Sequence, residues 1–282
     1  MTYSKTLRAA VLPLCLASAV TACASAQAPW YYQPEHNAIG RIYAYERTNT
    51  DGSLDERVNV FRRDATHIEV YKENGLCEGA ALVTAELDFE TFSAPVITGG
   101  QLRPNAEHME FAFLEWDQAQ ERLDILVQFP DMELREAAPI LSTPWHLFDY
   151  DLASLTVMTP HLAAPENGFE FGMALVWADP SAADPLSWMG DVSASYTGNE
   201  SREGVHTRHY VLAGTALEGE ASTGDTGELW LDLGDGHVVE AIIPAPNHPG
   251  YTDFHLRLLA VSDGGAAEWT RLLTAHFENC VD

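Results

Sequence analysis

The sequence predicts a mainly β domain: a curved antiparallel sheet or half-open barrel with one packed amphipathic helix. Three observations support this fold class. Apolar and polar residues alternate through much of the chain, turn-forming residues separate these stretches, and one segment has helical spacing instead. Hydrophobic residues make up 46% of the chain and aromatic residues 10%, which is enough to build a core.

The first 22 residues have the pattern of an export signal. Lys5 and Arg8 give a positive start, and residues 9–22 form an apolar stretch without a charged side chain. This stretch is shorter than the roughly 20 apolar residues that span a bilayer. We therefore expect residues 1–22 to be removed during export.

Two cleavage sites compete at the end of this segment. Val20-Thr21-Ala22-Cys23 resembles a bacterial lipobox, in which Cys23 would carry lipid. Ala24-Ser25-Ala26 instead resembles a site whose cleavage releases a soluble protein. We favour lipidation at Cys23, with residues 23–37 as a tether, a periplasmic location at the outer membrane, and no membrane contact beyond the lipid.

Four cysteines are present, and two of them remain for the folded domain. Cys15 lies in the export signal and Cys23 in the lipobox. Cys77 and Cys280 form an even pair in an exported chain, so we expect a disulfide between them. The alternative is two buried thiols. The chain has no C-x-x-C motif, which removes support for redox catalysis or a zinc ribbon.

Alternating apolar residues predict strands over most of the remaining chain, in a single β-rich domain over residues 38–282. Thr50–Ser53 and Gly234–Gly236 are turn signals between neighbouring strands, so sequential strands should pair antiparallel. Strands are expected at residues 39–47, 56–62, 123–129, 169–177, 228–233, 237–243 and 254–260.

One segment follows a helical pattern. Thr143 is a plausible N-cap, Pro144 suits the first helical position, and Pro160 ends the segment. The apolar residues recur at spacings of three, four and three: Trp145, Phe148, Leu152 and Leu155. We expect one helix at about 144–158, packed against the sheet, and two lobes are an open alternative with a division near 136–167. Asp179–Asp184 is expected to be a surface loop.

The charge of the chain excludes several partners. Its formal net charge is −27, and removal of the export signal makes it more negative because Lys5 and Arg8 are lost. Such a chain repels phosphate backbones, so nucleic acid is not an expected partner. Bare anionic lipid surfaces are disfavoured for the same reason.

The later hairpins resemble those of proteobacterial envelope proteins. The resemblance covers about 85 residues, and its residues are Tyr196–Glu200, Gly204, Thr207, Tyr210, Leu229–Asp232 and Gly236–Glu240. These families include uncharacterised periplasmic proteins and, more distantly, the lipoprotein carriers LolA and LolB. The resemblance implies a curved sheet around helical elements with an apolar concavity that accepts acyl chains. The carriers use several helices where one is predicted here, and no ligand-binding residue transfers by position.

Catalytic and metal-binding patterns are weak. His206 and His209 should point to opposite faces of a strand and cannot share a metal, and the loop from Asn247 to His255 has no metal-ligand spacing. Nucleophile-elbow, H-E-x-x-H and phosphate-binding motifs are absent from the sequence. We therefore predict no catalytic residue, no metal and no cofactor, and interpret most of the 42 acidic residues as surface charge.

The leading hypothesis is a non-enzymatic envelope protein whose concavity holds a lipid or other hydrophobic molecule. The alternatives are a structural module with a solid core that binds another envelope protein and, less favoured, a hydrolase of glycans or lipids. The candidate ligand-lining residues are Leu123, Ile125, Val127, Trp145, Phe148, Phe169, Phe171 and Trp177.

Overall fold

The computed structural model describes residues 29–177 and 184–280. Within these residues, fifteen strands form one sheet in the order β8-β7-β6-β5-β4-β3-β2-β1-β15-β14-β13-β12-β11-β10-β9. The first eight strands are β1 (Ile42–Thr48), β2 (Glu56–Arg62), β3 (His67–Glu73), β4 (Ala80–Asp88), β5 (Ser93–Arg103), β6 (Glu107–Asp117), β7 (Arg122–Phe129) and β8 (Met132–Pro139). The others are β9 (Trp145–Leu147), β10 (Phe169–Val176), β11 (Leu186–Arg202), β12 (Val205–Ala213), β13 (Thr226–Asp232), β14 (Val238–Ile243) and β15 (Phe254–Ser262).

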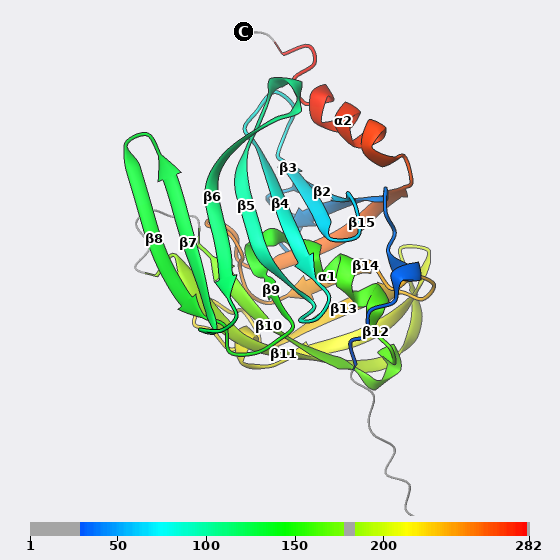
Figure 1. Cartoon of the computed structure of the whole chain (residues 1–282). Helices are drawn as coiled ribbons and strands as arrows, with labels where there is room; N and C mark the ends of the chain where they lie inside the picture. Colours follow the sequence, from blue (N-terminus) through cyan, green and yellow to red (C-terminus); the bar gives the residue numbers. More distant parts are fainter. Residues whose placement is uncertain (1–28, 178–183, 281–282) are drawn as a thin grey trace, which may run out of the picture.

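The first and last strands of the chain pair at the middle of the sheet. β1 is antiparallel to β15, from Ile42 opposite Ser262 to Thr48 opposite His255. β8 and β9 lie at the two edges, although only residues 140–144 separate them in sequence. Because so short a link spans at most about 20 Å, the edges must approach each other. The sheet therefore folds back over itself and encloses a concave side (Figure 1).

This architecture confirms the predicted fold class of a curved, mainly antiparallel sheet around a helix. The alternation in the sequence identified the buried sides of strands correctly: Leu123 and Ile125 of β7 are buried, as are Phe254 and Leu256 of β15. The prediction of an antiparallel meander fails at one place, because β9 runs parallel to β10 with Trp145 opposite Gly172.

The predicted helix at 144–158 is wrong over its first half. Residues 145–147 are strand β9, a 3-10 turn follows at η3 (Phe148–Tyr150), and only α1 (Ala153–Met158) is α-helical. Asp151 and Leu152 have left-handed backbone angles, with φ of 50° and 58°, which end any helix at that point. All six residues of α1 are buried in the concavity.

A second helix, α2 (Gly265–Ala275), was not predicted. It packs on the convex side of the sheet, opposite to α1, as Figure 1 shows. Trp269 stacks on Phe61 of β2 with ring centroids 5.2 Å apart, and its indole N–H donates to Glu69 Oε2 at 2.5 Å. Trp269 and Leu273 thus build a small core separate from the main one.

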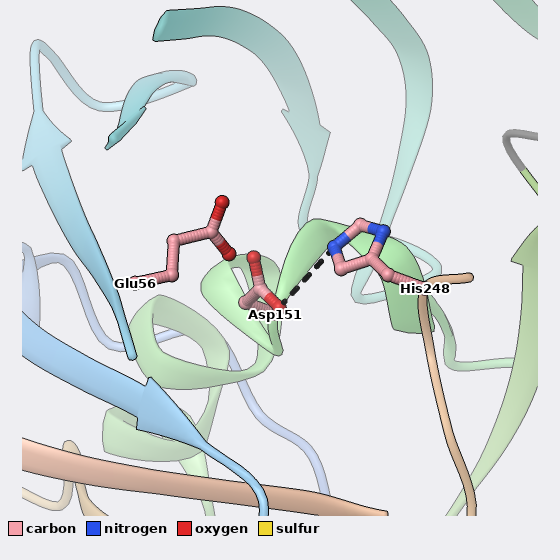
Figure 2. Close-up of side chains that lie close together, drawn as sticks. All are labelled: Glu56, Asp151 and His248. Atoms are coloured by element: carbon pink, nitrogen blue, oxygen red, sulfur yellow. Dashed lines mark ion pairs between the residues drawn. The ribbon is translucent and has the colours of Figure 1, made fainter. Parts of the chain in front are cut away.

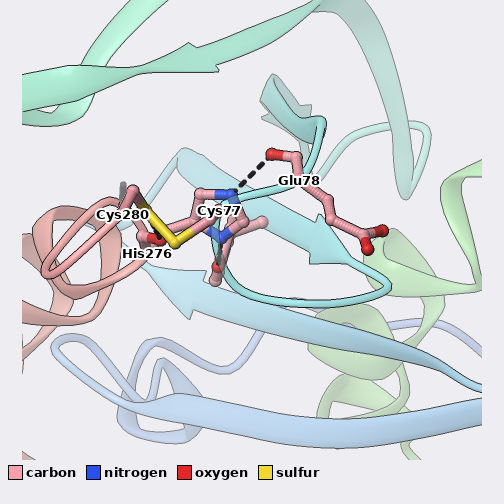
Figure 3. The surroundings of a disulfide bond; sticks show 5 residues. Cys77, Glu78, His276 and Cys280 are labelled. Atoms are coloured by element: carbon pink, nitrogen blue, oxygen red, sulfur yellow. Dashed lines mark hydrogen bonds between the residues drawn. A yellow bond between two sulfur atoms is a disulfide. The ribbon is translucent and has the colours of Figure 1, made fainter. Parts of the chain in front are cut away.

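The disulfide predicted between Cys77 and Cys280 is confirmed, with a Cα–Cα distance of 5.4 Å. Figure 3 shows His276 beside this bond. The His276 imidazole makes hydrogen bonds to the Tyr71 hydroxyl at 2.7 Å and to the Glu78 carbonyl oxygen at 2.8 Å. The loop between β3 and β4 is therefore tied to the end of α2 both covalently and through hydrogen bonds.

Part of the expected tether packs against the domain. Trp30 lies between Phe92 and Phe169, with ring centroids 5.5 and 5.3 Å away, and its indole N–H donates to the Glu170 carbonyl at 3.3 Å. The expected export signal, the lipobox and residues 23–28 lie outside the described residues, as does most of the loop expected at 179–184. Among the described residues, no helix combines the length and apolar character needed to cross a membrane.

Candidate functional site

An open cavity of about 480 Å³ lies on the concave face of strands β4 to β8. This volume is within the range of small-molecule sites, roughly 300 to 1,000 Å³. Most of the cavity wall is aliphatic or aromatic: Val83, Ile97, Leu114, Ile125, Val127, Leu134, Leu147, Val176 and Trp177.

Small residues explain why this part of the concavity is not filled. Ala81, Gly99 and Ala112 stand on neighbouring strands of the cavity wall and carry little or no side chain. The register between β5 and β6 also shifts here: Gly99 is opposite Ala112, whereas Gly100 is opposite Glu110. Phe111 is the extra residue of this bulge, which allows it to line the cavity together with Ala112.

Apolar side chains also surround the opening of the cavity. Phe129 and Met132 flank the turn between β7 and β8 and are 37% and 41% exposed. The Phe129 ring contacts that of Phe111 with a centroid distance of 4.7 Å. An apolar molecule can therefore reach the cavity across a surface of similar character.

The inner end of the cavity is polar. Lys72 of β3 lines it together with Asp149, Tyr150 and His248. The Lys72 ammonium lies 2.5 Å from Asp151 Oδ2, donates to the Asp149 carbonyl at 2.5 Å, and is 3.4 Å from His248 Nε2. The ammonium thus has hydrogen-bond contacts to the Asp149 carbonyl and to His248, and an ion pair with Asp151.

Asp151 is the centre of a buried network that joins the two halves of the sheet. Asn247 donates to Asp151 Oδ1 at 2.7 Å and to the Phe148 carbonyl at 3.0 Å, and it accepts a hydrogen bond from Arg47. The Arg47 guanidinium is fully buried, with its Nε 4.0 Å from Asp151 and its Cζ 3.1 Å from the centroid of the Tyr251 ring. Arg47 and Lys72 come from the first half of the chain, and Asp151 and Asn247 from the second.

Burial sets the protonation behaviour of this network. Burial alone raises the pKa of Asp151, but the nearby Lys72, His248 and Arg47 outweigh it and hold that pKa below its ordinary value. Burial raises the pKa of Glu56 and of Asp149 to about 7, despite the attraction of Lys72. Burial lowers the pKa of His248 to about 3, so its imidazole is neutral at physiological pH.

Two groups of side chains have the composition of metal ligands. Glu56, Asp151 and His248 bring ligand atoms within 4.8 Å of one another, and Figure 2 shows their polar ends facing each other. Lys72 and Arg47 already pair with Asp151, so this carboxylate is not available as a metal ligand.

The second group is part of a tight turn. Asp232 Oδ1 accepts the backbone N–H groups of Gly234 and Asp235 at 2.7 and 2.8 Å, and Asp235 pairs with Arg41 at 2.5 Å and with His237. Turn geometry and ion pairing account for these side chains without a metal.

A serine beside a histidine is one of the two arrangements that a hydrolase would need, and the described residues contain two such pairs. Ser201 Oγ is 3.3 Å from His206 Nδ1 on the exposed hairpin of β11 and β12, outside the cavity. The other pair is buried. Ser154 Oγ is 2.9 Å from His146 Nδ1, and both residues are only 1% exposed. Neither lines the cavity, and burial lowers the pKa of His146 to about 3. A substrate has no route to this pair among the described residues.

The candidate ligand-lining residues divide between cavity and core. Ile125, Val127 and Trp177 line the apolar cavity, and Phe169 lines a different one near Trp30. The other four belong to the packed core: Leu123, Trp145, Phe148 and Phe171.

The polar residues of the site were missed by the sequence analysis. Lys72 is the only lysine after Lys5, which is the one signal in the sequence that could have singled it out. Asp151 and His248 gave no such signal, since 97 residues separate them and no motif surrounds either.

No protein-family model and no curated protein matches this sequence. Among solved structures, the chain is similar to the hypothetical lipoprotein YmcC of Escherichia coli, with 9% identity and a TM-score of 0.30 over 81% of this chain and 89% of that one. It is also similar to a domain classed as an outer membrane lipoprotein-sorting protein from Vibrio parahaemolyticus, with 9% identity and a TM-score of 0.24 over 83% and 91%. With TM-scores of 0.30 and 0.24, these similarities do not support an inference about the ligand or activity of this protein.

Proposed function

We propose that this protein is a non-enzymatic component of the bacterial envelope that holds a lipid or other hydrophobic molecule in its apolar cavity. The observation that carries the proposal is the open cavity of about 480 Å³ on the concave face of β4 to β8. Well-packed interiors leave few voids larger than a water molecule. An apolar space of this size, with exposed aromatic and methionine side chains at its opening, is therefore best explained by a ligand.

A binding assay with a matched pair of variants tests this proposal. Ala112→Phe places a ring in the cavity wall, whereas Ala260→Phe adds the same ring at an exposed position of β15. We expect an apolar fluorescent probe to bind the native protein and the Ala260→Phe variant. The Ala112→Phe variant should bind it at least about tenfold more weakly, which corresponds to about 1.4 kcal/mol.

Native mass spectrometry supplies the second readout. Protein extracted from the source envelope should retain a lipid-sized mass that is absent from the Ala112→Phe variant. If the native protein binds neither probe nor lipid, carriage is refuted. Recovery of one defined envelope protein in its place would support the structural, protein-binding alternative.

The location of the protein is part of the same proposal. The lipobox around Cys23 supports attachment to the outer membrane, and a cleaved N-terminus at Gln27 would instead indicate a soluble periplasmic protein. The mass of the N-terminal peptide distinguishes them. A diacylated or triacylated Cys23 is expected, and Cys23→Ala should release the protein from the membrane fraction.

A further inference from the structure

A second cavity, of about 430 Å³, adjoins the apolar one at the ends of β2 and β3. The two cavities share five lining residues: Lys72, Ala81, Gly100, Phe111 and Phe129. The second cavity adds a set of polar side chains, and we call it the polar annex: Glu56, Glu73, Asn74 and Gln101. An apolar space that opens into a polar one suits an amphiphile, with its chain in the first and its head group in the second.

The charges of the annex select the kind of head group. Glu56 Oε2 is buried and has no hydrogen-bond partner among the described residues. Lys72 is the only cation among the residues lining the annex, and Asp151, Asp149 and His248 already occupy its ammonium. An anionic head group would therefore find no unoccupied ammonium, whereas a cationic one would find a carboxylate oxygen, Glu56 Oε2, that accepts no hydrogen bond.

Aromatic rings at the junction favour the same charge. Phe111 and Phe129 lie 4.7 Å apart, ring centroid to ring centroid, on the wall that the two cavities share. The negative face of an aromatic ring attracts cations, and quaternary ammonium groups in particular are recognised this way. An amphiphile whose apolar chain lies in the first cavity and whose head group lies in the annex must contact these rings.

We propose that the ligand is an amphiphile with a positively charged ammonium head group, whose apolar chain fills the main cavity and whose head group enters the polar annex beside Glu56 and Glu73. This inference rests on the proposed function, because it requires that an apolar chain binds at all. It goes further by naming the chemical class of the head group and the residues that recognise it.

The protonation of Glu56 gives the proposal a measurable consequence. Burial raises the pKa of Glu56 to about 7, with Asp151 and Glu73 adding to the rise and Lys72 and Arg47 opposing it. A bound cation stabilises the ionised carboxylate and must therefore release a proton below that pKa. Affinity for the cation should rise with pH, by up to about tenfold between pH 6 and pH 8.

The test compares three probes that share a twelve-carbon chain: dodecyltrimethylammonium, dodecanol and dodecanoate. Each is titrated calorimetrically below its micelle concentration, at about 0.15 M ionic strength, where the Debye length is about 8 Å. We expect the ammonium probe to bind at least about tenfold more tightly than the other two. If all three bind equally, the head-group proposal is wrong and the proposed function stands. If none binds, the proposed function itself fails.

Variants assign the effect to the annex. Glu56→Gln combined with Glu73→Gln should weaken the ammonium probe about tenfold and leave dodecanol unchanged. Glu133→Gln is the matched control, since Glu133 lines the apolar cavity and not the annex. An equal loss in Glu133→Gln would show general attraction to an acidic protein and would overturn the proposal.

The pH dependence keeps the proposal testable even if the double variant folds poorly. Asp149, which also lines the apolar cavity, has a pKa of about 7 as well, and Glu56→Gln alone separates the two carboxyl groups. Flat affinity between pH 6 and pH 8 in the native protein would contradict the role of Glu56. Unchanged pH dependence in Glu56→Gln would assign it to Asp149 and contradict that role equally.

Discussion

Replacement of Lys72 by methionine should destabilise the domain more than any single loss of a surface charge. Lys72→Met keeps most of the side-chain volume but removes the ammonium that lies 2.5 Å from the fully buried carboxylate of Asp151. Removing one partner of a buried ion pair typically costs about 3–5 kcal/mol, because the other charge is left without compensation. Asn247 at 2.7 Å and Arg47 at 4.0 Å still contact Asp151, so we expect about 3 kcal/mol.

Urea unfolding at pH 7, followed by tryptophan fluorescence, measures this change. The control is Arg122→Met, which breaks the exposed pair between Arg122 and Asp124 at 3.0 Å and should change the free energy of unfolding by no more than about 1 kcal/mol. The double variant Lys72→Met with Asp151→Asn should recover part of the loss, because residue 151 then carries no unpaired charge, while the buried Arg47 guanidinium loses its carboxylate partner. Equal stability of Lys72→Met and Arg122→Met would refute the assigned role of the buried pair.

The same substitution should have a defined pH dependence. The pKa of Asp151 is below its ordinary value in the folded protein, so its ion pairs stabilise the fold above the unfolded pKa and are lost as pH falls through the folded one. The difference between native protein and Lys72→Met is therefore largest near pH 7 and should shrink in acid. A difference that grows as pH falls would contradict this reasoning.

Three further substitutions probe the helix, the disulfide and the convex face. Trp269→Ala should lower the free energy of unfolding by about 3–5 kcal/mol, measured in urea, because it removes the ring that α2 stacks on Phe61. The double variant Cys77→Ser with Cys280→Ser should lower the free energy of unfolding by about 2–5 kcal/mol in the same assay, since the disulfide links two residues that are 203 positions apart in sequence. Burial raises the pKa of Glu240, but hydrogen bonds and ion pairs outweigh this and lower it to about 2, so Glu240→Gln should cost about 2 kcal/mol at pH 7, after allowance for solvent screening. That loss should disappear as the pH of the unfolding buffer falls from about 5 to 2.

The strands were predictable because one side of each faces a core. Leu123 and Ile125 alternate with more exposed neighbours, and turn residues such as those at 50–53 and 234–236 mark where the chain reverses. Such local patterns specify which residues are buried. They do not specify which strands are neighbours, so the pairing of β1 with β15 was outside their reach.

The two helices were not predicted correctly, and the reason differs between them. The segment around α1 has helical spacing of apolar residues, but polar side chains between them, such as His146 and Thr156, are buried as well. A segment that is enclosed on all sides has no polar stripe, so spacing cannot distinguish strand from helix there. α2 has only two buried anchors, Trp269 and Leu273, and no helix was expected after the strand at 254–260.

The polar centre of the site could not be predicted because its members meet only through the tertiary fold. Arg47, Lys72, Asp151 and Asn247 come from four separate segments, and none belongs to a motif. Two strands of the first half and two connections of the second bring them together across the junction of β1 and β15. Long-range pairing of this kind leaves no periodic signal in the sequence.

The position of the cavity follows from how little of the concave face one short helix can cover. α1 has six residues, which at 1.5 Å per residue is about 9 Å of helix, or roughly the width of two strands spaced 4.8 Å apart. Thr156 of α1 makes a 2.9 Å hydrogen bond to Tyr45 of β1, so the helix lies over the middle of the sheet. The concave face of β4 to β8 is therefore left without a helix, and the small residues Gly99 and Ala112 do not fill it. A longer helix, or larger side chains at these positions, would have produced a solid core. Among residues 29–177 and 184–280 neither is present, which is why we propose that an apolar molecule covers this face.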